Sequence, residues 1–116
     1  MKQDGAIPVL FPPVWAPPEV GRHGGYGGYY DAMDVAFRKS RESIEALARR
    51  AGLAIVRVPL DTLKGSMFVD FCHLNLEGET IKARYVADAI MPLVEQLKLS
   101  GRFAAVLHPQ PLCGVP

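Results

Sequence analysis

Two long stretches of helical periodicity alternate with two short apolar runs, and this order constrains the fold more than any other feature. Apolar residues recur at helical spacing over residues 29–51 and again over residues 76–97. Residues 6–11 and 53–58 are short runs of mainly apolar side chains, a pattern that favours buried strands. Strands that alternate with helices are typical of parallel βαβ units, so the sequence predicts an α/β fold.

The residues at the helix ends support this interpretation. Gly52 directly follows the first helical stretch, and glycine is the residue that most often terminates a helix. Asn75 precedes the second stretch, and Glu77 and Glu79 fall in its first turn. Asparagine is a good N-cap and acidic side chains suit the positive end of a helix. We therefore expect one helix to end near residue 51 and another to begin near residue 76.

Two strands, even with a third at residues 103–107, are too few to bury both faces of a parallel sheet. The sequence therefore predicts a partial three-layer sheet whose N-terminal strands are missing. Residues 1–99 would form this domain, and the proline-rich residues 100–116 an irregular tail. Apolar surface left uncovered by a partial sheet would favour self-association.

Composition excludes several partners. The net charge of the 116 residues is +1, which gives no electrostatic case for binding nucleic acid. No stretch fits a membrane span or a signal peptide, so a cytoplasmic location is expected. Cys72 and Cys113 fit either one disulfide or a reduced intracellular chain, and show no zinc pair spacing. His23 and His108 lack a carboxylate or cysteine at ligand spacing, so we predict neither a metal nor a cofactor.

Asp70 and His73 are the strongest candidates for chemistry. The acid stands three residues before the histidine, on the loop that leads into the second helix. This spacing allows one short loop to present a carboxylate that orients an imidazole, and an oriented imidazole is a general base. Imidazole is also the side chain best suited to take and return a proton near neutral pH.

Residues 68–78 resemble, nearly letter for letter, the last signature block of the SGNH (GDSL-type) hydrolases. The resemblance implies that His73 is the base and Asp70 the acid of a Ser-His-Asp triad. It also implies a flavodoxin-like parallel sheet, of which residues 1–99 would be the C-terminal part. The substrates of the full-length form would be acyl esters of small molecules, lipids or acetylated glycans.

The chain departs from the family in one important respect. The Gly-Asp-Ser-Leu nucleophile block and the oxyanion-hole residues have no counterpart in the sequence, and would belong upstream of Met1. Ser66 is the only serine expected in a loop, but it shares the loop of the base, and a turn serine is the plainer interpretation. Cys72 is expected to pack behind that loop as a buried thiol. The sequence therefore predicts a fragment with base and acid that is inactive alone.

A proline-, glycine- and aromatic-rich segment, residues 12–30, has two interpretations. Trp15 and the tyrosines could form the walls of a substrate cleft. The segment could equally be a surface loop. It also supports an alternative function for the whole chain, a non-catalytic α/β binding module or homodimer that uses this loop.

Overall fold

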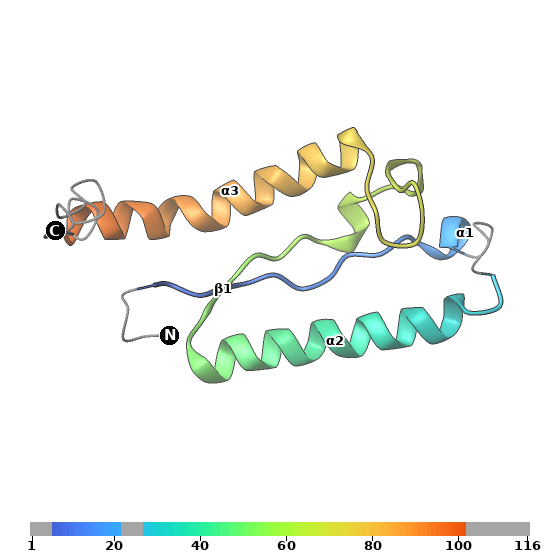
Figure 1. Cartoon of the computed structure of the whole chain (residues 1–116), viewed down its shortest axis with the longest axis horizontal. Helices are drawn as coiled ribbons and strands as arrows, with labels where there is room; N and C mark the ends of the chain where they lie inside the picture. The colour runs from blue at the N-terminus through green and yellow to red at the C-terminus, as the bar shows by residue number, and fades with distance from the viewer. Residues whose placement is uncertain (1–5, 22–26, 102–116) are drawn as a thin grey trace, which may run out of the picture.

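The computed structural model describes residues 6–21 and 27–101 of the chain. Helices dominate it, and a short parallel sheet lies between them (Figure 1). The elements in chain order are β1 (Val9–Leu10), α1 (Pro18–Gly21), α2 (Tyr30–Ala51), β2 (Ala54–Ile55), the 3₁₀ turns η1 (Leu60–Thr62) and η2 (Gly65–Met67), and α3 (Leu76–Leu99).

Strands β1 and β2 pair in parallel, with Val9 opposite Ala54 and Leu10 opposite Ile55. The N–H of Val56 extends the ladder by donating to the Leu10 carbonyl at 2.9 Å. Helix α2 is the crossover between the two strands, and Figure 1 shows α2 and α3 on opposite sides of the extended segments. The predicted α/β class with parallel pairing is confirmed.

A three-layer sheet is not seen in the described part of the chain, where the sheet has two strands of two residues each. Prolines at positions 8, 12, 13 and 17 flank β1, and Pro59 follows β2. Proline has no N–H to donate, so each strand is confined to a few residues. The strand predicted at residues 103–107 lies outside the described residues.

Both helix boundaries predicted from the sequence are confirmed. Gly52 ends α2 in the left-handed conformation, with φ of 60°, and its N–H donates to the Ala48 carbonyl. A left-handed residue at this position is the usual way to satisfy the last carbonyls of a helix. The Asn75 side chain caps α3 by accepting a hydrogen bond from the Gly78 N–H at 3.1 Å.

The interior consists of two apolar clusters. The larger cluster joins the strand segments, the η turns and α3, and its members are Val14, Ala16, Val56, Val58, Leu63, Met67 and Phe68. The smaller cluster joins Trp15, Tyr30 and Phe71, against which Met33 and Phe37 of α2 pack. Because the second cluster includes Phe71, it reaches the loop that carries the candidate acid and base.

Trp15 and Tyr30 are buried members of the smaller cluster, and both also border an open hollow of about 300 Å³. Their exposed fractions are 5% and 2%. The Trp15 indole N–H donates to Asp34 Oδ1 at 2.7 Å, and the Tyr30 hydroxyl donates to the Ala16 carbonyl at 3.0 Å. Each aromatic ring is thus buried with its polar atom hydrogen-bonded, as core Trp and Tyr residues usually are.

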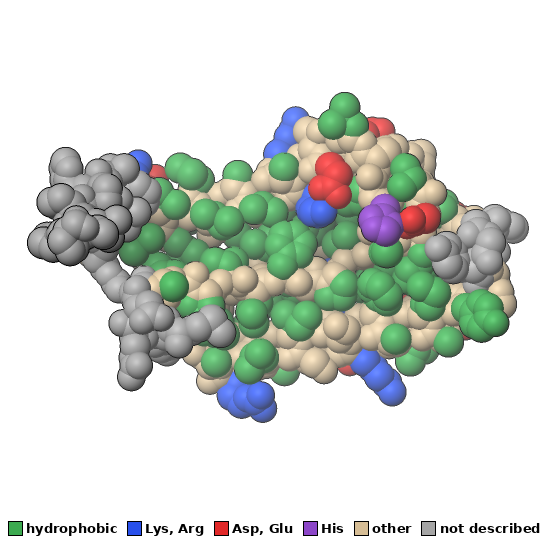
Figure 2. All heavy atoms as spheres, in the orientation of Figure 1, with side chains coloured by type: hydrophobic (Ala, Val, Ile, Leu, Met, Phe, Trp, Pro, Cys, Tyr) green, Lys and Arg blue, Asp and Glu red, His purple; other side chains and the backbone are tan. Residues whose placement is uncertain are grey.

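Large apolar side chains remain exposed on the described part of the chain. Exposed large apolar side chains include Val35, Val69, Leu76 and Met91. Apolar side chains are spread widely over the face in Figure 2. Among the described helices, none is both long enough and apolar enough to cross a bilayer.

Candidate active site

The loop between η2 and α3 is a narrow turn closed at its base. Phe68 and Leu74 form an antiparallel bridge, and the Asn75 N–H donates to the Met67 carbonyl at 2.7 Å. Above the bridge, the Val69 N–H donates to the His73 carbonyl at 2.9 Å. Residues 69–73 therefore form the tip of the turn, and Asp70 and His73 both stand on it.

Phe71 fixes the tip to the body of the protein. Its side chain is 2% exposed and packs edge-on against Tyr30 and Phe37, with ring centroids 5.6 and 5.1 Å apart. Its carbonyl accepts a hydrogen bond from the Ala16 N–H at 2.7 Å. Because Phe71 points inward, the residues on either side of it point outward.

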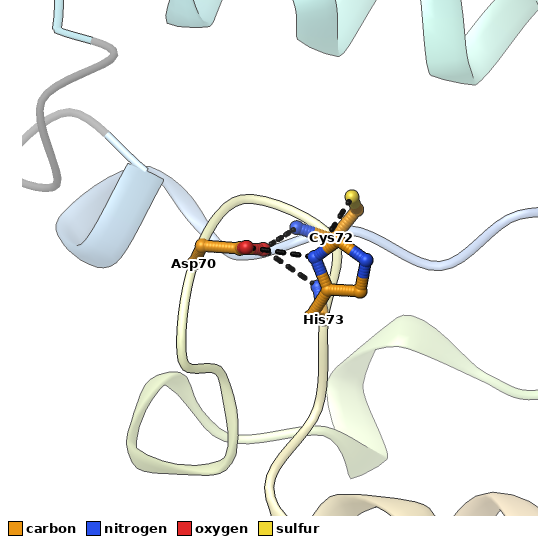
Figure 3. Close-up of side chains that lie close together, drawn as sticks. All are labelled: Asp70, Cys72 and His73. Atoms are coloured by element: carbon orange, nitrogen blue, oxygen red, sulfur yellow. Dashed lines mark hydrogen bonds and ion pairs between the residues drawn. The ribbon is translucent and has the colours of Figure 1, made fainter.

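Asp70 is the organising residue of the tip. Its Oδ1 atom accepts hydrogen bonds from the main-chain N–H groups of Cys72 and His73, at 2.9 and 2.8 Å. Its Oδ2 atom lies 2.7 Å from Nδ1 of His73 (Figure 3). The structure thus brings together the two residues that the sequence singled out.

The hydrogen bonds determine the charge of Asp70. The N–H groups of Cys72 and His73, and then the His73 side chain, hold the pKa of the Asp70 carboxyl below its ordinary value. Asp70 is therefore ionised at neutral pH and can only accept from the imidazole. The proton between them belongs to Nδ1, which leaves Nε2 of a neutral His73 as an acceptor.

His73 is open to solvent. Its side chain is 72% exposed and that of Asp70 is 36% exposed. Figure 2 shows the imidazole on the molecular surface beside an acidic side chain. A reacting group can therefore approach the ring without any movement of the turn.

Cys72 is exposed, and the expectation of a buried thiol is wrong. Its Sγ atom lies 3.8 Å from Nδ1 of His73. Partial burial and the charge of Asp70 both raise the pKa of the Cys72 thiol. A protonated thiol is a poor nucleophile, so the environment does not favour covalent catalysis by Cys72.

Ser66 lies at the base of the turn, in η2, and its carbonyl accepts a hydrogen bond from Asn75 Nδ2 at 2.9 Å. The Phe68–Leu74 bridge separates this position from the tip. The geometry therefore agrees with the interpretation of Ser66 as a turn serine.

Sequence reasoning missed one grouping. Asp70, Cys72 and His73 each offer an atom that can ligate a metal, and these atoms all lie within 4.8 Å of one another. Zinc sites are recognised in a sequence by paired cysteines or histidines at fixed spacing, and one short turn with three different ligand types has no such signature. His23, His108 and Cys113 lie outside the described residues.

One hollow begins next to the turn, on α3. It has a volume of about 710 Å³ and is lined by Asn75, Leu76, Glu77, Thr80, Ile81 and Arg84. A smaller hollow of about 300 Å³ borders the Trp15–Pro18 segment and α2. Both are open surface depressions, and neither contains Asp70 or His73 in its lining.

No protein-family model, curated protein or solved structure matches the chain.

Proposed function

We propose that Asp70 and His73 are the acid and base of an acyl-ester hydrolase whose nucleophile comes from a polypeptide segment outside the described residues. The observation that carries the proposal is the 2.7 Å contact between Asp70 Oδ2 and His73 Nδ1. It has the connectivity of the acid–base half of a Ser-His-Asp triad, in which the acid holds Nδ1 and leaves Nε2 for the nucleophile. The SGNH-like block at residues 68–78 supports the same assignment.

In the proposed reaction, Nε2 of His73 takes the proton of a serine hydroxyl while its oxygen attacks the ester carbonyl. The imidazolium that forms is stabilised by ionised Asp70, and then gives its proton to the departing alcohol. A water molecule, activated by His73 in the same way, then attacks the acyl-enzyme and releases the carboxylic acid product and the free serine. The substrates would be acyl esters of small molecules, lipids or acetylated glycans, as the resemblance implies.

The same proposal makes the short sheet a part of a larger one. Strands β1 and β2 would be two members of a three-layer parallel sheet of SGNH type, and further strands would bring the nucleophile and oxyanion donors to the exposed imidazole. The exposure of Val35, Val69, Leu76 and Met91 supports this idea, because these apolar side chains are left for such strands to cover.

The orientation of the base can be tested on this chain alone. In a long-range ¹H–¹⁵N spectrum, neutral His73 should be protonated on Nδ1, with the signal assigned by its loss in His73→Gln. Asp70→Asn should disturb this preference, because an amide no longer requires a donor on Nδ1. A native His73 protonated on Nε2 would contradict the proposed role.

A second candidate is a non-catalytic α/β module that associates through its apolar surface. The specific observation in its favour is the exposure of Val35, Val69, Leu76 and Met91, each at least half exposed. Such a protein would keep the Asp70–His73 contact as part of the turn. Because the partial sheet of the first candidate would also self-associate, a native His73 protonated on Nε2 is the result that would favour this module.

A further inference from the structure

The tip of the turn gathers three different metal-ligating side chains within four residues. Asp70, Cys72 and His73 each offer one ligand atom, and these atoms all lie within 4.8 Å of one another. Nδ1 of His73 lies 2.7 Å from Oδ2 of Asp70 and 3.8 Å from Sγ of Cys72. Figure 3 shows the carboxylate and the thiol both directed toward the same ring nitrogen of His73, from different directions. We propose that these three residues form a binding site for a divalent transition-metal ion, Zn²⁺ in the first place.

The two distances to Nδ1 of His73 are close to those a tetrahedral ion requires. Zinc bonds of 2.0–2.3 Å place an oxygen and a nitrogen ligand roughly 3.4 Å apart, and a sulfur and a nitrogen ligand roughly 3.6 Å apart. The Sγ–Nδ1 distance is 3.8 Å, already near this separation. The Oδ2–Nδ1 distance is 2.7 Å, so the carboxylate must retreat by well under the length of one bond.

The turn is organised before any ion arrives. Phe71 is buried between Asp70 and Cys72, and the Phe68–Leu74 bridge closes the loop below them. Two main-chain N–H groups hold Oδ1 of Asp70, which leaves Oδ2 for the metal. Hydrogen bonds of this kind to the second carboxylate oxygen orient a ligand in metal sites.

The donor set selects the metal. A thiolate and an imidazole suit Zn²⁺ or Co²⁺, whereas Mg²⁺ and Ca²⁺ prefer oxygen ligands alone. The 72% exposure of His73 leaves room for water as a fourth ligand. Metal binding releases one proton, that of the Cys72 thiol. The proton of neutral His73 is not released but moves from Nδ1 to Nε2.

This site and the proposed base exclude each other. Nδ1 cannot bind an ion and donate to Asp70 at the same time, and in the metal-bound form Nε2 carries the proton and cannot accept another. Bound Zn²⁺ would therefore prevent His73 from acting as a general base. The site itself does not depend on the proposed hydrolase function, since it needs only the three ligands.

Cobalt provides a readout independent of any activity. Titration of the reduced chain with Co²⁺ should give a near-ultraviolet thiolate-to-metal band that saturates at one equivalent and is abolished by Zn²⁺. Cys72→Ser should remove the band, and His73→Gln should weaken Co²⁺ binding at least tenfold. Cys113→Ser is the matched control and should leave the band unchanged.

Circular dichroism of each variant checks that the fold is kept, which the exposure of Cys72 and His73 leads us to expect. Absence of the band in the native chain at micromolar protein would overturn the proposal. So would a band that survives Cys72→Ser or disappears in Cys113→Ser. A band that is lost in Cys72→Ser and kept in Cys113→Ser would establish the Cys72 thiolate as a ligand.

Discussion

The Phe71 carbonyl accepts a hydrogen bond from the Ala16 N–H at 2.7 Å, and this contact joins the tip of the turn to the segment that follows β1. The Tyr30 hydroxyl donates to the Ala16 carbonyl from the other side, and the Tyr30 ring packs edge-on against Phe71. Phe71 lies between Asp70 and His73 in the chain. Its contacts with residues far away in sequence therefore set the position of both.

Phe71→Ala should destabilise the fold by about 3–5 kcal/mol, the usual cost of removing a buried phenylalanine ring. It should also free the tip, because the anchor that turns Asp70 outward is lost. Urea unfolding followed by tryptophan fluorescence measures the first effect, since Trp15 belongs to the same cluster. Phe71→Leu keeps most of the buried volume and should cost less than half as much.

The chain by itself should show no serine-esterase activity above background. Base and acid cannot form an acyl-enzyme without a nucleophile and oxyanion donors. Fluorophosphonate labelling and p-nitrophenyl acetate hydrolysis measure this. Stoichiometric labelling that Ser66→Ala abolishes would show that the base of the turn supplies a nucleophile after all.

In a longer polypeptide that also carries the nucleophile, His73→Ala should lower kcat by about 10⁴-fold or more and leave the fold intact. Asp70→Asn should cost less, because the base itself remains. The fold should survive His73→Ala since that side chain is mostly solvent-exposed. Esterase assays with circular dichroism as a control test both, and retention of most activity in His73→Ala would remove His73 from the mechanism.

Local signals in the sequence predicted the helices and their ends, because Gly52 and Asn75 act through their own conformation and hydrogen bonding. The Asp70–His73 contact was also predictable, since three residues of one turn suffice to make it. The burial of Trp15 was not, because it depends on Asp34 of α2. The prediction that the Cys72 thiol is buried was wrong because Phe71, and not Cys72, takes the inward position of the turn.

The order of the tip should depend on pH through Asp70. The folded pKa of Asp70 lies below the ordinary value of an aspartate carboxyl. The ionised carboxylate therefore contributes its full stability above the ordinary pKa, and this contribution is lost as pH falls through the lower folded pKa. Amide chemical shifts of Cys72 and His73 should therefore change in that acidic range. Asp70→Asn should remove this transition, and its persistence in the variant would assign it to another group.

The last prediction concerns apolar surface. Two strands leave the sheet with unpaired edges in the described part of the chain, and large apolar side chains stay exposed on α2, on the turn and on α3. We expect the isolated chain to bind the dye ANS and to form dimers or larger species in size-exclusion light scattering.

Leu76→Ser, at a position 84% exposed, should reduce dye binding without loss of helix, whereas Lys39→Ser on α2 is a polar control that should not. A monodisperse monomer that unfolds cooperatively and binds no dye would mean that two strands and three helices suffice to close the core. The sheet would then need no further strands, and a non-catalytic module that binds through the loop of residues 12–30 would become the leading interpretation.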